Sequence, residues 1–162
     1  MKLAVYVHVP FCKSKCVYCD FYSVVSEKFD EYFSCLLKEI DLYEEVLRES
    51  EIKTAYFGGG TPSVVSPSFL GMVLEKLERV SRSFTPIEIT IEVNPESVEP
   101  EKLKIYKQIG INRISLGVQA CDDTVLKNTG RLYNDETLKK KAKIILERFE
   151  NVNFDFILGL PS

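Results

Sequence analysis

Hydrophobic and polar positions alternate between two periods along this chain, which predicts repeated βα units. Runs with a two-residue period, typical of strands, cover residues 3–9, 54–57, 87–94, 113–119 and 153–158. Apolar residues at three- and four-residue steps lie between these runs and predict amphipathic helices, the longest over residues 27–49. Crossover connections of this length require parallel, right-handed pairing, so we expect one parallel sheet of five strands.

Residues that typically begin or end helices support this division. Ser66 and Pro67 predict an N-cap and a first helical residue. Pro100 predicts the start of the next helix and Gly110 its end. Either Asn134 or Asp135 is expected to cap the last helix.

The predicted strands have one apolar and one polar face. In residues 87–94 the odd-numbered positions are apolar and the even-numbered ones are polar, and residues 113–119 divide in a similar way. Central parallel strands with helices on both faces are apolar almost throughout. We therefore expect a curved sheet, a barrel or part of one, with helices outside and a polar concave side. Sites in such folds gather at the carboxyl ends of the strands.

Length and charge narrow the possible classes of protein. The 162 residues suffice for one domain with a real core. The 21 basic and 24 acidic side chains give a net charge of −3, which does not favour a nucleic-acid partner. No apolar run approaches the ~18 residues of a membrane span, and the first ten residues do not form a secretory signal. We expect a soluble, cytoplasmic protein.

Three cysteines lie within eight residues, directly after the first predicted strand. Cys12, Cys16 and Cys19 have the spacing Cys-x3-Cys-x2-Cys. A structural zinc site requires four protein ligands, whereas this loop offers three sulfurs and no adjacent histidine. A [4Fe-4S] cluster held by three thiolates keeps one iron open for a small molecule. A zinc site completed from elsewhere, a disulfide with a spare thiol, and unrelated buried thiols remain alternatives.

Glycines follow the second predicted strand in the run Gly58-Gly59-Gly60-Thr61-Pro62. No lysine follows at the spacing of a P-loop, and the Rossmann glycine pattern is absent. Consecutive glycines allow the backbone to approach a ligand such as an amino-acid head group. A tight βα turn is the alternative.

Polar residues on the expected concave face form a third group. Glu92, Gln119 and Asp155, with Arg131 on a following loop, offer two carboxylates, an amide and a guanidinium. Together these groups can bind ribose hydroxyls, an adenine edge and a carboxylate. The alternative is a polar network between strands that is satisfied without a ligand.

Six motifs in order resemble those of the oxygen-independent coproporphyrinogen III oxidases and their haem-chaperone relatives, in the radical S-adenosylmethionine (SAM) superfamily. They are Tyr-x-His-x-Pro-Phe-Cys-x3-Cys-x-Tyr-Cys-Asp-Phe, Gly-Gly-Gly-Thr-Pro-Ser, Glu-Val-Asn-Pro-Glu, Ser-Leu-Gly-Val-Gln, Gly-Arg and Asp-Phe-Ile-Leu-Gly-Leu-Pro. The similarity extends over essentially the whole chain.

The resemblance implies a fold, cofactors and site residues. The fold would be a partial TIM-like (β/α) radical SAM barrel, with about five parallel strands present. Cys12, Cys16 and Cys19 would ligate a [4Fe-4S] cluster, and SAM would bind the fourth iron. One electron from the cluster would cleave SAM to methionine and a 5′-deoxyadenosyl radical, an oxidoreductase reaction in porphyrin and haem metabolism. The SAM site would be lined by Tyr6, Tyr18, Gly59, Gly60, Thr61, Glu92, Gln119, Arg131 and Asp155.

Departures from the family pattern affect the expected substrate. The decarboxylases carry another cysteine two positions after the third cluster cysteine, where this chain has Phe21. Cys-Asp-Phe is similar to the haem-chaperone branch, which binds and transfers haem. A second departure is Tyr133, since relatives commonly have histidine there. The expected partners are a small-molecule substrate or haem, and an electron donor such as a flavodoxin or ferredoxin.

The family also predicts that residues 1–162 are the amino-terminal part of the barrel domain, with the remaining barrel and a carboxyl-terminal domain absent. A sheet that stops at the fifth strand exposes an unpaired edge, so we expect self-association.

Overall fold

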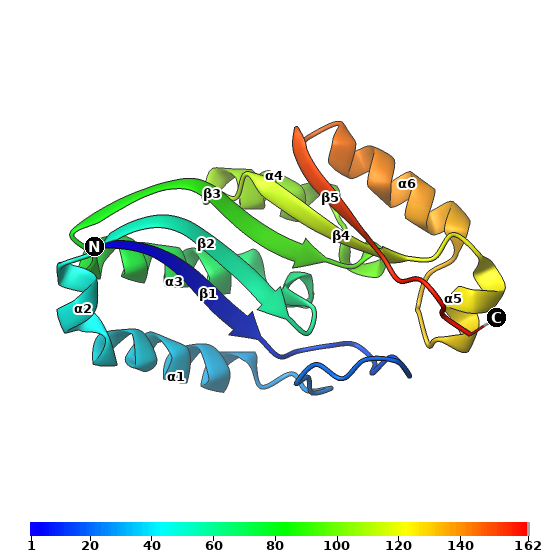
Figure 1. The fold of residues 1–162 in the computed structure, drawn as a ribbon, viewed down its shortest axis with the longest axis horizontal. Helices are drawn as coiled ribbons and strands as arrows, with labels where there is room; N and C mark the ends of the chain where they lie inside the picture. Colours follow the sequence, from blue (N-terminus) through cyan, green and yellow to red (C-terminus); the bar gives the residue numbers. More distant parts are fainter. Residues whose placement is uncertain (162) are drawn as a thin grey trace.

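The computed structural model describes residues 1–161 and contains one five-stranded sheet. Its strands are β1 (Lys2–Val9), β2 (Glu51–Gly59), β3 (Ser83–Val93), β4 (Arg113–Gln119) and β5 (Asn151–Phe156). They lie side by side in chain order, and each neighbouring pair is parallel. This confirms the predicted parallel sheet, an open part of a barrel with β1 and β5 at its two edges (Figure 1).

The helices cover one face of this sheet and leave the concave face open (Figure 1). They are α1 (Phe29–Leu42), α2 (Glu44–Arg48), α3 (Pro67–Val80), α4 (Pro100–Gln108), α5 (Asp123–Asn128) and α6 (Asp135–Leu146). Two 3₁₀ turns, η1 (Pro62–Val64) and η2 (Pro95–Ser97), follow β2 and β3. The polar side of the strands is therefore free to bind a ligand.

Most predicted helix boundaries are confirmed. Ser66 caps α3, Asn134 caps α6, and Gly110 ends the α4 segment with φ of +91°. The single helix over residues 27–49 was wrong. At Tyr43 the N–H donates to the carbonyl of Ile40, three residues back, and this tighter turn separates α1 from α2.

The apolar faces of the strands form the core together with the helices. Ile89, Ile91 and Val93 of β3 are buried, as are Ile114 and Leu116 of β4. On α3 the buried residues recur at helical spacing and pack against this layer. The predicted face assignment therefore holds over the central strands.

Ile87 is the exception, because the sequence pattern placed it on the apolar face and it is 77% exposed. The pairing of β2 with β3 shifts register between Ile52 and Thr54, so Ile87 has no partner in the ladder. The alternation of apolar and polar positions therefore does not predict burial where such an irregularity interrupts the strand.

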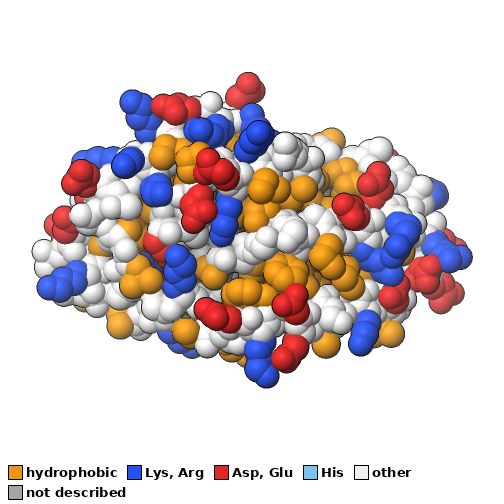
Figure 2. All heavy atoms as spheres, turned by 180° about the vertical axis from the view of Figure 1, so that it is seen from behind, with side chains coloured by type: hydrophobic (Ala, Val, Ile, Leu, Met, Phe, Trp, Pro, Cys, Tyr) orange, Lys and Arg blue, Asp and Glu red, His pale blue; other side chains and the backbone are white. Residues whose placement is uncertain are grey.

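The helix-covered side carries acidic and basic side chains interspersed with apolar ones (Figure 2). Among residues 1–161, no helix is long and apolar enough to cross a membrane. Self-association through an edge strand stays a prediction.

A close backbone contact joins the loop after β1 to the turn after β2. The N–H of Gly60 donates to the carbonyl of Val9 (2.9 Å), and that of Thr61 donates to the carbonyl of Phe11 (2.7 Å). A Cβ on Gly60 would lie 2.8 Å from backbone atoms of Pro10 and Phe11. The glycine is therefore required by the packing of the cysteine loop itself.

We expect Gly60→Ala to destabilise the protein by about 1–3 kcal/mol, because backbone atoms of the loop would have to move. Gly71→Ala is the matched control. Gly71 lies inside α3, and a Cβ there would make an ordinary contact with Ile109 at 3.5 Å. Helix propensity favours alanine over glycine by up to about 1 kcal/mol. Denaturant unfolding measures the free energy of unfolding of each variant. If both substitutions changed it equally, the requirement for glycine at position 60 would be contradicted.

Candidate functional site

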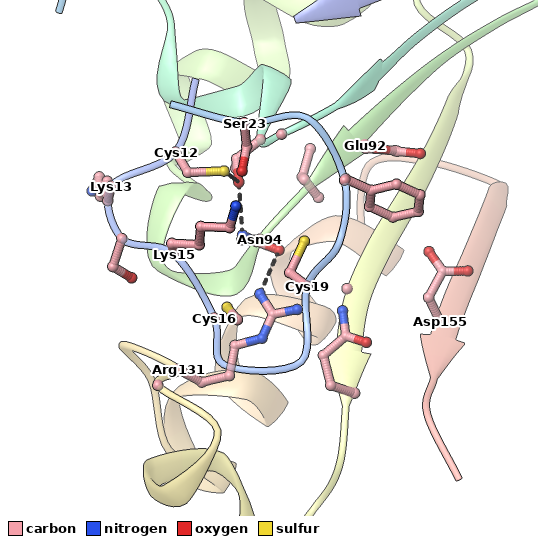
Figure 3. A pocket seen from close by; sticks show the side chains of 18 of the residues that line it. Cys12, Lys13, Lys15, Cys16, Cys19, Ser23, Glu92, Asn94, Arg131 and Asp155 are labelled. Carbon is pink, nitrogen blue, oxygen red and sulfur yellow. Dashed lines mark hydrogen bonds between the residues drawn. The ribbon is translucent and has the colours of Figure 1, made fainter. Parts of the chain in front are cut away.

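A cavity of about 420 Å³ opens at the carboxyl edge of the sheet. Its walls are the cysteine loop, the turn after β2, the ends of β3, β4 and β5, and residues 130–132 after α5 (Figure 3). Eleven of the twelve residues predicted from the sequence line it: Cys12, Cys16, Tyr18, Cys19, Gly59, Gly60, Thr61, Glu92, Gln119, Arg131 and Asp155. Segments more than 130 residues apart in the chain therefore meet around one hollow.

The cysteine loop is anchored at several points. Cys12 donates its N–H to the carbonyl of Val24 (3.0 Å), and Val24 donates to the carbonyl of Pro10 (2.8 Å). In the middle of the loop, Val17 donates to the carbonyl of Thr129 beyond α5 (3.3 Å). Hydrogen bonds thus hold the loop both to the segment after β1 and to the carboxyl end of α5.

All five cysteines are free, and those at positions 12, 16 and 19 line the cavity, whereas Cys35 and Cys121 are exposed elsewhere. Cys12 Sγ lies 3.6 Å from Thr61 Oγ1. Burial raises the pKa of the Cys16 thiol. Within residues 1–161, no three Cys, His, Asp or Glu side chains converge closely enough to hold a single metal ion. A [4Fe-4S] cluster does not require that convergence, because each thiolate binds a different iron.

Glu92 lies at the end of β3, beside the glycine turn. Its Oε1 accepts a hydrogen bond from the Tyr56 hydroxyl (2.7 Å), and its Oε2 accepts from the Gly59 N–H (3.1 Å). Burial nevertheless raises the pKa of this carboxyl, against the opposing effect of the two hydrogen bonds. Each oxygen keeps a free lone pair, so Glu92 can still accept from a ligand.

Arg131 lies against two aromatic rings in the wall. Its Cζ is 5.6 Å from the ring centroid of Tyr18 and 5.8 Å from that of Tyr133. Its Nη1 donates to Asn94 Oδ1 (3.1 Å). In turn Asn94 donates from Nδ2 to Thr61 Oγ1 (3.0 Å), so one chain of contacts links the guanidinium to the glycine turn.

The opposite wall carries Asp155 of β5. Asp155 accepts from the Ser115 hydroxyl (2.7 Å) and from Nδ2 of Asn153 (2.7 Å). These donors hold the carboxylate in place while it lines the cavity. The arrangement provides a fixed acceptor for hydroxyl groups.

Tyr6 is the one predicted site residue that does not line this cavity. It is 57% exposed and stacks on Tyr56 with ring centroids 5.9 Å apart. Its hydroxyl lies 3.3 Å from His8 Nδ1, and His8 Nε2 lies 3.0 Å from the carbonyl oxygen of Tyr22. The His8 ring occupies the space above Gly59, where a Cβ would lie 2.6 Å from it.

Sequence reasoning did not single out Asn94 and Glu96, which line the cavity after β3. Both lie in the Glu-Val-Asn-Pro-Glu motif at a strand end, which was the available signal. Burial raises the pKa of Glu96. Its Oε2 is buried without a hydrogen-bond partner, as are Tyr18 Oη and Arg131 Nε. Buried polar atoms are normally paired, so these three orphan atoms in one cavity wall are available to a polar ligand.

The donor set and these orphan atoms fit an iron-sulfur cluster with an adjoining SAM. Three free thiols from one loop could serve as the cluster ligands. The neighbouring wall supplies carboxylates, amides and a guanidinium for an amino-acid nucleoside. Residues that could hold each group therefore lie side by side.

Comparisons with known proteins agree with this geometry. The sequence profile of the radical SAM superfamily matches residues 6–162. The heme chaperone HemW of Bacillus subtilis is 36% identical over 163 residues, and that of Escherichia coli is 35% identical over 164 residues. These matches cover 97% and 99% of this chain, but only 42% and 43% of the two relatives.

Among solved structures, the coproporphyrinogen III oxidase HemN of Escherichia coli superimposes with a TM-score of 0.89 at 29% identity. The superposition covers 98% of this chain and 37% of HemN, so the chain spans less than half the length of the proteins it matches. The chain belongs to the radical SAM superfamily, among the relatives of HemN and HemW.

Proposed function

We propose that this chain binds a [4Fe-4S] cluster through Cys12, Cys16 and Cys19, and SAM in the adjoining cavity, for the reductive cleavage of SAM. The observation that carries the proposal is that three free thiols of one loop line the same cavity as the polar ends of β3, β4 and β5. When bound, the cluster supplies the electron that cleaves SAM to methionine and a 5′-deoxyadenosyl radical.

The chain's own residues would bind and orient SAM. Arg131, fixed by Asn94 and two rings, suits the methionine carboxylate. The carboxylate of Glu92 suits the ammonium group, since it already lies against the turn at Gly59. On the far wall, Asp155 suits ribose hydroxyls. Because Gly60 has no Cβ, the backbone of the cysteine loop can pack directly against this turn.

A second candidate function is the binding and transfer of haem without coproporphyrinogen oxidation. It is supported by the similarity to the heme chaperones HemW, by Phe21 in place of a fourth cysteine, and by apolar side chains at the cavity mouth. These side chains are those of Phe21, Leu132 and Ile157, which are exposed. Exposed apolar side chains around a mouth suit a large flat ligand. For the reductive cleavage of SAM, we further propose a flavodoxin or ferredoxin as the electron donor, and a cytoplasmic location.

Replacing any one of Cys12, Cys16 and Cys19 by serine should abolish a stable [4Fe-4S] cluster after anaerobic reconstitution, because a thiolate ligand is lost. Cys35→Ser is the matched control, since this thiol is exposed on α1. Iron, sulfide and zinc analysis with absorption spectra reads the result. Stoichiometric zinc without sulfide in the wild type would contradict the proposal.

Arg131→Lys should weaken SAM binding about tenfold to a hundredfold, because a charge-assisted hydrogen bond contributes about 1.5–3 kcal/mol. Cluster content should not change, and production of 5′-deoxyadenosine should fall. Arg79→Lys, on the exposed side of α3, is the control. Calorimetry under anaerobic conditions gives the affinity, and equal affinities for both variants would rule out the assigned role.

Phe21→Ser should weaken haem binding about tenfold to a hundredfold, because the loss of one aromatic side chain buried against the ligand costs roughly 1.5–3 kcal/mol. Leu146→Ser, an exposed apolar position on α6, is the control. Haem titration followed by Soret absorption measures both. Turnover of coproporphyrinogen by the wild type would instead favour the oxidase reading.

A further inference from the structure

The end of β4 contains a strained backbone position beside the cavity. Among residues 1–161, Gln119 is the only non-glycine residue with positive φ, at +64°. The N–H of Ala120 donates to the carbonyl of Val118 (2.8 Å) and closes a γ-turn around Gln119. The form of this turn with positive φ is rare and strained. Such a position persists where surrounding contacts enforce it.

This turn directs Gln119 toward the cavity. The pairing of β4 with β5 passes from Gly117–Asp155 to Gln119–Phe156 and leaves Val118 without a partner. A Cβ on Gly117 would lie 2.8 Å from both Gln119 Nε2 and Asn94 Oδ1. The amide of Gln119 therefore folds back over Gly117 and lies near the oxygen that holds Arg131.

Tyr133 reaches this turn from the segment after α5. Its side chain is 7% exposed, and its hydroxyl is within donating distance of the carbonyls of Gly117 (2.8 Å) and Val118 (3.0 Å). These are the two carbonyls that precede Gln119. The ring of the same side chain faces the guanidinium of Arg131. Tyr133 thus contacts both the backbone that positions Gln119 and the guanidinium of Arg131.

We infer that Tyr133 is a positioning residue for the SAM site: it holds the γ-turn that aims Gln119 into the cavity and supports the guanidinium of Arg131. The inference rests on the proposed function, because the groups that it positions are those assigned to SAM. The observation that carries the inference is that the Tyr133 hydroxyl lies within donating distance of the two carbonyls that precede the strained turn, while its ring faces Arg131.

Tyr133→Phe removes this hydroxyl and keeps the ring. With cluster content unchanged, the Kd for SAM should rise about threefold to tenfold, as the loss of one neutral hydrogen bond predicts. Tyr106→Phe is the matched control, because Tyr106 is 1% exposed and its buried hydroxyl has no partner. This control should leave the Kd for SAM unchanged.

Two further measurements separate positioning from a general loss of stability. In a Gln119→Ala background, Tyr133→Phe should weaken SAM binding less than it does in the wild type, since part of its effect acts through Gln119. In the ligand-free protein, hydrogen exchange at the amides of Ala120 and Ile157 should become faster in Tyr133→Phe and not in Tyr106→Phe. The amide of Ala120 donates to the carbonyl of Val118, and the amide of Ile157 donates to the carbonyl of Gln119.

Equal SAM affinity of wild type and Tyr133→Phe would overturn the inference, whether or not exchange becomes faster. Full additivity with Gln119→Ala would also overturn it. If the wild type loaded with its cluster did not bind SAM, the proposed function itself would be contradicted, and this inference with it.

Discussion

The division of each strand into one apolar and one polar face is the constraint on which this structure depends. Helices bury the apolar face, where Ile89, Ile91 and Leu116 lie, and the polar face stays open. Because all five strands are parallel, their carboxyl ends meet at one edge. The walls of the cavity are strand ends and the loops that follow them, together with residues 130–132 after α5. The site is thus a direct result of the sheet's topology.

Much of this could be predicted from the sequence, because the signals were local. The alternation of apolar residues gave the strands their faces, and caps such as Ser66 and Asn134 gave helices their starts. The cysteine spacing and the motifs at strand ends identified eleven residues that line one cavity. All of them except Arg131, which follows α5, lie near the carboxyl end of a predicted strand or in the loop that follows it.

The remainder depended on contacts that no local pattern contains. Helices α1 and α2 are separated at Tyr43 by one hydrogen bond of a tighter turn. The exposure of Ile87 follows from a register shift between β2 and β3. Tyr6 lies on the polar face of its strand, as the alternation predicts. Its strand β1 is an edge of the sheet, however, and the Tyr6 ring stacks on Tyr56 outside the cavity. Asn94 looked like one more polar position on a strand face. Its links to Thr61 and Arg131 exist only in the folded chain.

The anchoring of the cysteine loop sets an order of assembly. Its middle is held by the carbonyl of Thr129, and its cavity is closed by Arg131 and by Asp155 on the last strand. Contacts of such long sequence separation form late, after the intervening chain has folded. During synthesis the three thiols emerge before Arg131 and Asp155, so the pocket around them is completed only when β5 has been made. A ligand that requires the complete pocket can therefore bind only after β5 has been synthesised and has paired with β4.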